Sequence, residues 1–96
     1  MEIIIHRINS IKKLKKIPIN FGVEIDLRVH KSKIVLNHEP FKSGDTLDDF
    51  LNHYKHGTLI LNIKEDGIED DVIKRVKKAK VKSYFLLDVE FPYIFK

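Results

Sequence analysis

The sequence predicts an α/β fold built on a parallel sheet. Two observations support this prediction. Short apolar runs alternate with amphipathic segments, and five of the runs end in polar or ionisable residues. Parallel strands are buried on both faces and present functional groups at their carboxyl ends, so these groups would meet at one edge of the sheet. The five segments are residues 3–7, 22–26, 36–40, 59–64 and 84–88.

The composition is that of one small globular domain. The chain has 96 residues, of which 43% are hydrophobic and 33% are charged, so it can bury a core. It has no cysteine, which excludes disulfides, zinc–thiolate sites and thiol nucleophiles but leaves hard-cation sites with oxygen ligands. The formal charge of +4 suits an anionic ligand, and it is equally typical of a lysine-rich composition.

The sequence predicts a cytoplasmic, soluble protein. The first apolar run covers only residues 3–5 and charged residues follow at once, unlike a secretory signal. No stretch approaches the roughly 20 apolar residues of a membrane-spanning helix. Many lysines lie between residues 74 and 82, but no aromatic residue interleaves with them and no nucleic-acid-binding motif is present. Nucleic acid is therefore the least favoured partner.

The apolar runs define the expected strands. Alternation in the second strand puts Glu24, Asp26 and Arg28 on one face. Residues 34–36 resume a strand after a polar turn, either as a hairpin partner or as an extended return toward the shared edge. The four expected parallel strands are residues 3–5, 23–29, 59–63 and 81–89.

Three helices are expected between these strands. Ser10 would cap a short helix that Pro18 ends. Thr46 would cap a second helix with an apolar stripe, ending at Gly57. The third helix follows Gly67, with acidic residues in its first turn and basic residues later, as the helix dipole favours. A strand–helix–strand rhythm of this kind indicates βαβ units.

Glu24 and Asp26 are the first candidates for chemistry. Residues two apart on a strand point to the same side, and two acids on an otherwise apolar strand need compensation by a cation or by basic groups. A divalent cation such as Mg²⁺ or Ca²⁺ fits such oxygen ligands. The alternatives are a solvated edge strand, or a pair neutralised by Arg7 and Lys64.

His6 and His38 are the second pair of candidates, because each ends an apolar run. Two imidazoles suit phosphoryl chemistry, in which one removes a proton from the nucleophile and the other protonates the leaving alkoxide. Arg7 and Lys64 could then hold the non-bridging phosphate oxygens. The remaining histidines are interpreted as solvated: His30, His53 and His56.

These segments resemble the start of the glycerophosphodiester phosphodiesterase family, within the phospholipase-C-like phosphodiesterase superfamily. That family opens with His-Arg-Gly, continues with Gly-x-x-x-Glu-x-Asp-Val and His-Asp, and then has a strand carrying Glu-x-Lys. Its elements resemble, in the same order, four segments of this chain: His6-Arg7-Ile8, Gly22-Val23-Glu24-Ile25-Asp26-Leu27, Asn37-His38-Glu39-Pro40 and Asn62-Ile63-Lys64.

The resemblance implies a role for each matching residue. His6 and His38 would be the acid–base pair, and Arg7 and Lys64 would contact phosphate. Glu24 and Asp26 would bind the metal, with Asn62 at the position of the third carboxylate. The chain departs from the family at Ile8, Glu39 and Asn62, which replace glycine, aspartate and a carboxylate. Because an amide brings no charge, the cation should bind more weakly.

The resemblance also implies a (β/α)8, or TIM, barrel, which needs roughly 200 residues or more. The chain would then be a single domain over residues 1–96, corresponding to the N-terminal half of such a barrel with about its first four strands. Three forms remain open: a truncated chain, which the apolar residues 91–95 favour, two copies paired through exposed sheet edges, or a small open sheet.

The expected function is metal-dependent hydrolysis of a small phosphodiester, or a remnant of that activity. The alternative is a module that binds a phosphate or a phosphosugar without turnover.

Overall fold

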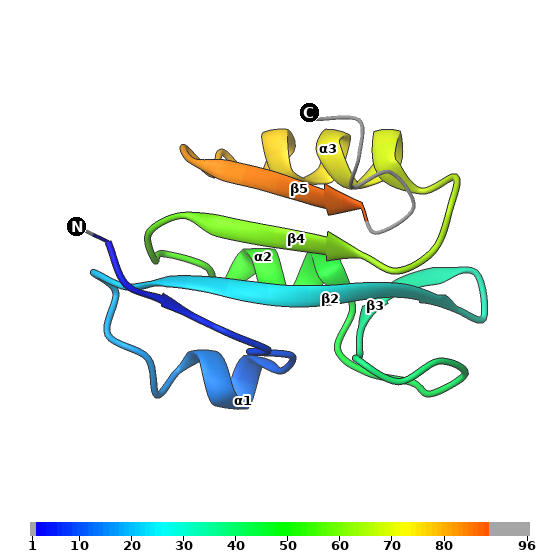
Figure 1. Cartoon of the computed structure of the whole chain (residues 1–96), viewed down its shortest axis with the longest axis horizontal. Coiled ribbons are helices and arrows are strands. Elements are labelled where there is room, and N and C mark those ends of the chain that lie inside the picture. The colour runs from blue at the N-terminus through cyan, green and yellow to red at the C-terminus, as the bar shows by residue number, and fades with distance from the viewer. Residues whose placement is uncertain (1, 89–96) are drawn as a thin grey trace.

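The computed structural model describes residues 2–88, and the predicted α/β class with a parallel sheet is confirmed. The described residues form five strands and three helices (Figure 1). In chain order these are β1 (Ile4–Ile5), α1 (Ile11–Leu14), β2 (Gly22–His30), β3 (Lys33–Leu36), α2 (Leu47–Asn52), β4 (Leu59–Ile63), α3 (Glu69–Lys78) and β5 (Tyr84–Asp88).

Four of the strands lie parallel in the order β1-β2-β4-β5, so each is beside the next parallel strand along the chain. β3 is antiparallel and pairs with β2 from Leu27 to His30. Of the two alternatives for residues 34–36, the hairpin partner is therefore correct. Lys31 and Ser32 form its turn, with φ of 50° and 67°.

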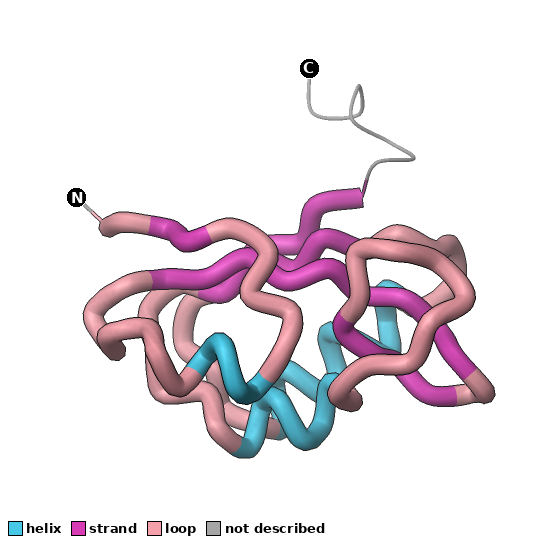
Figure 2. The backbone as a smooth tube through the Cα atoms, turned by 90° about the horizontal axis from the view of Figure 1, so that it is seen from below, coloured by secondary structure: helices cyan, strands magenta, loops and turns pink. Residues whose placement is uncertain are grey.

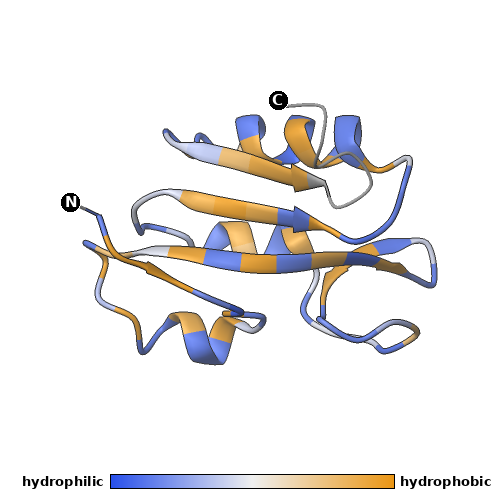
Figure 3. Cartoon of the chain, viewed as in Figure 1, coloured by the Kyte–Doolittle hydropathy of each residue, from blue (hydrophilic) through white to orange (hydrophobic). Residues whose placement is uncertain are grey.

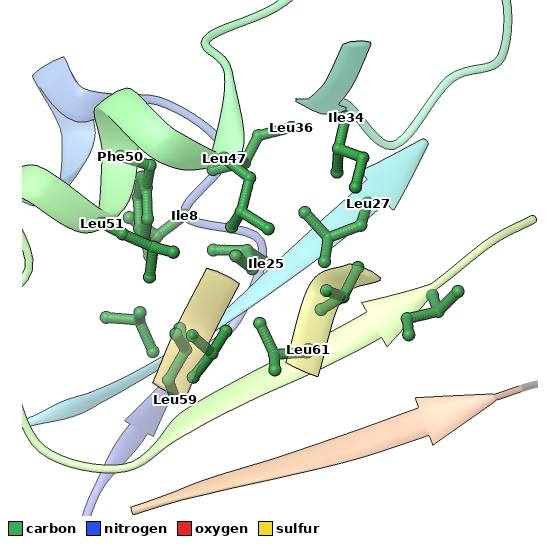
Figure 4. Packing of buried hydrophobic residues seen from close by; sticks show 14 of the residues in the cluster. Ile8, Ile25, Leu27, Ile34, Leu36, Leu47, Phe50, Leu51, Leu59 and Leu61 are labelled. Atoms are coloured by element: carbon green, nitrogen blue, oxygen red, sulfur yellow. The ribbon is translucent and has the colours of Figure 1, made fainter. Parts of the chain in front are cut away.

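The helices all lie on one face of the sheet (Figure 2). Alternate residues of β2 up to Leu27, and of β4, point toward them and are at most 1% exposed: Val23, Ile25, Leu27, Leu59, Leu61 and Ile63. α2 contributes Leu47, Phe50 and Leu51 to the same cluster, as Figure 4 shows. This layer is the hydrophobic core, and its burial is the main favourable term in folding.

The helix boundaries follow local capping. Ser10 Oγ accepts a hydrogen bond from Lys13 N at 3.1 Å, and Thr46 Oγ1 accepts one from Asp49 N at 3.2 Å, so both predicted N-caps are confirmed. The expected end of α2 at Gly57 is wrong, because the helix ends at Asn52. The Tyr54 hydroxyl donates to the Gly57 carbonyl at 2.6 Å, which folds the segment after α2 into the turn before β4.

The opposite face of the sheet carries no helix within residues 2–88 (Figure 2). It takes the alternate residues of each strand, and the alternation is visible along β2 in Figure 3. We call it the open face. Its side chains are polar toward the carboxyl ends of β2 and β4 and apolar on β5, where Phe85 and Leu87 are 61% and 46% exposed.

Two sequence-based expectations concern residues beyond this range. The fourth parallel strand was expected over residues 81–89 and is observed as Tyr84–Asp88, with position 89 outside the described residues. The apolar stretch 91–95 also lies outside them. None of the described helices combines the length and apolar character needed to cross a membrane.

Candidate functional site

Three of the predicted oxygen ligands lie on the open face at neighbouring positions. Glu24 and Asp26 are two residues apart on β2, so they share a face. Asn62 on β4 is the register partner of Asp26, while Ile60 is the partner of Glu24. Partners in a parallel pair point to the same side of the sheet. The structure therefore places Glu24, Asp26 and Asn62 together; alternation predicted the shared face of the first two, and the family resemblance implied the third.

His6 pairs with Glu24. The histidine directly follows β1, and its Nδ1 lies 3.1 Å from Oε1 of Glu24. The histidine side chain is 75% exposed, whereas that of Glu24 is 14% exposed. The mostly buried carboxylate of Glu24 thus contacts Nδ1 of a largely exposed imidazole ring.

Asp26 is the only charged or polar residue among the buried side chains of the described chain, at 1% exposure. Asn9 Nδ2 donates to its Oδ2 at 3.0 Å, and Lys64 Nζ lies 3.9 Å from its Oδ1. A buried carboxylate is costly unless it is hydrogen-bonded and paired with a positive charge. Asn9 and Lys64 supply both kinds of compensation.

His38 approaches the same carboxylate from the segment after β3. Its Nδ1 lies 3.5 Å from Oδ2 of Asp26. Arg28, on the open face of β2, fixes the backbone here, because Nε and an Nη of its guanidinium donate to the His38 carbonyl at 3.1 and 2.8 Å. His6 and His38, 32 positions apart in sequence, are therefore held by two carboxylates on the same face of one strand.

The two histidine–carboxylate pairs share one chemical arrangement. In each pair the carboxylate faces Nδ1, and Nε2 forms no hydrogen bond with any other described residue. A carboxylate at Nδ1 selects the tautomer with its proton there, so the neutral ring presents an Nε2 lone pair, and the cationic ring presents an N–H. Such rings can accept or donate a proton at Nε2.

The two predicted phosphate contacts differ in their surroundings. Lys64 is half-buried and lies near Asp26. This contact agrees with one part of the alternative in which Arg7 and Lys64 neutralise the two acids. Arg7 is exposed, with a positive φ of 56°, and makes no ion pair within residues 2–88. Its guanidinium therefore remains available to an anion at the carboxyl end of the open face, where His6, Glu24, Asp26 and His38 lie. We call this end the rim.

The donor set for a hard cation is small. No group of three histidine, aspartate or glutamate side chains that could hold a metal occurs in the described part of the chain. A cation would depend on oxygens of Glu24, Asp26 and Asn62, which are the right type of ligand but carry only two charges. One oxygen of each carboxylate already faces a histidine, so these residues fit a weakly held cation.

Other features frame the rim. Glu39, which follows His38, bonds Lys42 Nζ at 2.7 Å, and this hydrogen bond lowers the pKa of Glu39. Beside His6 and Glu24, a shallow hollow of about 530 Å³ lies on the open face, lined mainly by apolar residues. These are Ile4, Ile60, Phe85, Leu86 and Leu87.

The interpretation of His56 as a solvated histidine is wrong. His56 is not solvated: it is half-buried, its Nε2 lies 2.8 Å from the Ile17 carbonyl oxygen, and its Nδ1 is buried without a partner among the described residues. The turn after α2 brings it against the Ile17 carbonyl, a contact that helical periodicity does not reveal. His53 is exposed, as expected, and its Nδ1 lies 2.9 Å from the Asp49 carbonyl oxygen.

Sequence reasoning missed Asn9. Besides donating to the Asp26 carboxylate, it accepts a hydrogen bond at Oδ1 from Asp26 N at 2.8 Å. Its position three residues after His6, beyond the end of a strand, was a usable signal.

Comparison of the chain with protein-family models, with curated protein sequences and with solved structures finds no match. The resemblance to the phosphodiesterase family therefore remains a prediction from the motifs.

Proposed function

We propose that the rim of the open face binds a phosphodiester and that His6 and His38 catalyse its hydrolysis by proton transfer. One observation carries the proposal: two rings from separate segments each place Nδ1 beside a carboxylate of β2, within hydrogen-bond distance at 3.1 Å for His6 and in a longer contact at 3.5 Å for His38. Isolated surface histidines have no need of such pairing. Two of them beside alternate residues of one strand favour a shared substrate.

The proposed reaction is a displacement at phosphorus. Water attacks the phosphorus atom and the bond to the leaving oxygen breaks. One neutral imidazole takes the water proton at Nε2, while the other ring, protonated, gives its Nε2 proton to the leaving alkoxide. Acid–base assistance of this kind typically contributes about 10²–10⁴-fold to rate.

The charge of the phosphate would be met by Arg7 and Lys64. A divalent cation, Mg²⁺ or Ca²⁺, would be held by Glu24, Asp26 and Asn62, and when bound it would stabilise the charge that develops on the phosphate oxygens. Glu24 and Asp26 would then have a second role, because they also orient the two rings.

We infer that the sheet corresponds to the N-terminal half of a (β/α)8 barrel. The support is the strand order β1-β2-β4-β5, with neighbours consecutive and helices on one face only. The outer edges of β1 and β5, which pair with no further strand within residues 2–88, would also allow two copies to pair. Sedimentation equilibrium tests this directly: a dimer mass supports pairing, and a monomer at high concentration contradicts it.

The alternative is binding of a phosphate or phosphosugar without turnover. The observation that favours it is the donor set, since Asn62 supplies no charge and two carboxylates alone hold a cation weakly. Under this alternative, the anion contacts Arg7, Lys64 and the histidine rings directly.

Hydrolysis of bis(p-nitrophenyl) phosphate, measured with added Mg²⁺ and again with EDTA, separates the two. Catalysis predicts turnover that EDTA abolishes and that His6→Gln or His38→Gln lowers about 10²–10⁴-fold. His53→Gln is the matched control, because this histidine is exposed and on another face. Turnover that survives both rim substitutions contradicts the mechanism, whereas phosphate binding that survives EDTA without turnover supports the alternative.

A further inference from the structure

We propose that Asn9 is a positioning residue that fixes the carboxylate of Asp26 and, through it, the ring of His38. The inference rests on the proposed function, because the orientation of His38 matters only if this ring acts on a ligand. The main-chain groups of Asp26 lie on the edge of β2 that pairs with β1 and β3.

Asp26 occupies a gap between two strands on this edge. β1 pairs with β2 only as far as Val23, and β3 pairs with β2 only from Leu27 onward. In between, Ile8 N donates to the Glu24 carbonyl at 2.9 Å and Asn37 N donates to the Asp26 carbonyl at 3.1 Å. The backbone N–H of Asp26 is the remaining group, and it donates to the side chain of Asn9 at 2.8 Å.

The side chain of Asn9 therefore holds Asp26 at two points. Oδ1 accepts from the Asp26 backbone, and Nδ2 donates to Oδ2 of the Asp26 carboxylate at 3.0 Å. Because the amide is planar and both bonds end on one residue, the carboxylate cannot rotate without breaking the second bond. This leaves Oδ1 toward Lys64 and keeps Oδ2 at 3.5 Å from Nδ1 of His38.

The segment that carries Asn9 is itself anchored. Ile8 is buried at 7% exposure and belongs to the hydrophobic core. Arg7, directly before it, takes a left-handed backbone conformation with φ 56°, which turns the chain inward after β1. A non-glycine residue in this region is strained, and burial of the side chain that follows offsets the strain.

A purely structural role for Asn9 makes a different prediction. If it only fills the gap at the strand edge, the bond from Asp26 N to Oδ1 is the one that matters. If it positions the carboxylate, the bond from Nδ2 to Asp26 matters as well. Asn9→Asp separates the two roles, because it keeps the acceptor and replaces the donor by a second carboxylate.

The test is the tautomer of His38, read by ¹⁵N NMR of histidine-labelled protein at pH 8. The wild type should show His38 mainly protonated at Nδ1. In Asn9→Ala and Asn9→Asp we expect this form to fall below half of the population, while the His6 tautomer stays unchanged. Asn52→Ala, an exposed asparagine of α2, should leave both rings as in the wild type.

An unchanged His38 tautomer in folded Asn9→Asp would overturn the inference. If Asn9→Ala does not fold, Asn9→Asp still decides, because it retains the backbone acceptor. The readout needs no turnover, so failure of the proposed function is distinguishable. A tautomer shift in a chain that does not bind a phosphodiester supports the positioning role and contradicts the proposed function. An unchanged His38 tautomer in a chain that hydrolyses a phosphodiester contradicts the positioning role and supports the proposed function.

Discussion

The two faces of the same sheet have opposite characters. On the covered face, alternate residues of β2 up to Leu27, and of β4, are aliphatic and at most 1% exposed. On the open face of the same strands lie Glu24, Asp26 and Asn62, with Phe85 and Leu87 exposed on β5. A one-residue step along a strand thus separates residues that hold the fold together from residues that are free for chemistry.

This difference explains how a small chain can carry several ionisable groups on its strands. Burial of the covered face supplies the stability, so the open face need not be apolar to keep the sheet folded. Only Asp26 is deeply buried among the polar residues there, and it has Asn9, His38 and Lys64 around it. The comparison predicts large effects on stability from the covered face and small ones from the open face.

Leucines on the two faces should give the largest contrast. Leu61→Ala on β4 removes a fully buried side chain and should lower the free energy of unfolding by about 2–5 kcal/mol. Leu87→Ala on β5 removes one that is 46% exposed, and we expect a loss of less than about 1 kcal/mol. Urea unfolding measures both. Equal losses would mean that the open face is covered in solution.

The two carboxylates of β2 should give the next largest difference in the free energy of unfolding. Asp26→Ala leaves the Asn9 amide and the half-buried Lys64 without their partner, which should cost about 1–3 kcal/mol. Glu24→Ala loses the pairing with an exposed histidine, and we expect less than about 1 kcal/mol. The same urea experiment tests the pair, and a larger loss for Glu24→Ala would contradict the account.

The smallest effect on stability is expected at the amino ends of β1 and β4, and it depends on pH. Thr58 Oγ1 and the Thr58 backbone N–H donate to the Glu2 carboxylate at 2.5 and 2.7 Å, and these bonds lower the pKa of Glu2. Because the folded-state pKa is the lower one, the stabilisation is present above the unfolded value of about 4.3 and disappears as pH falls through the folded value.

Thermal unfolding of Glu2→Gln against wild type, from pH 7 to pH 2, tests this prediction. The wild type should be slightly more stable at neutral pH, and the difference should shrink toward zero in acid. A difference that grows as pH falls would have the wrong sign.

Much of this arrangement could be predicted from the sequence. Period-two alternation put Glu24 and Asp26 on one face, and the apolar run over 59–63 gave β4 its residues. The cap residues Ser10 and Thr46 marked two helix starts because their side chains have a local target three residues on. These signals come from residues two or three positions apart, so a single sequence is enough to recognise them.

The rest depends on contacts between distant segments. The pairing of Asn9 with Asp26 spans 17 positions and fills a gap that exists only because β1 stops short of β3. The half-buried place of His56 depends on the Ile17 carbonyl, 39 positions away. The end of α2 at Asn52 depends on the turn that Tyr54 closes onto Gly57. Neither periodicity nor composition reports such partners.

The account depends most on His6 and His38 serving one ligand. Titration of the histidine-labelled chain with dimethyl phosphate, followed by ¹⁵N NMR with and without Mg²⁺, measures this directly. We predict that the Nε2 signals of His6 and His38 shift together with a single dissociation constant, while His53 does not respond. A shift of one ring without the other, or no shift of either, would contradict a shared phosphodiester site.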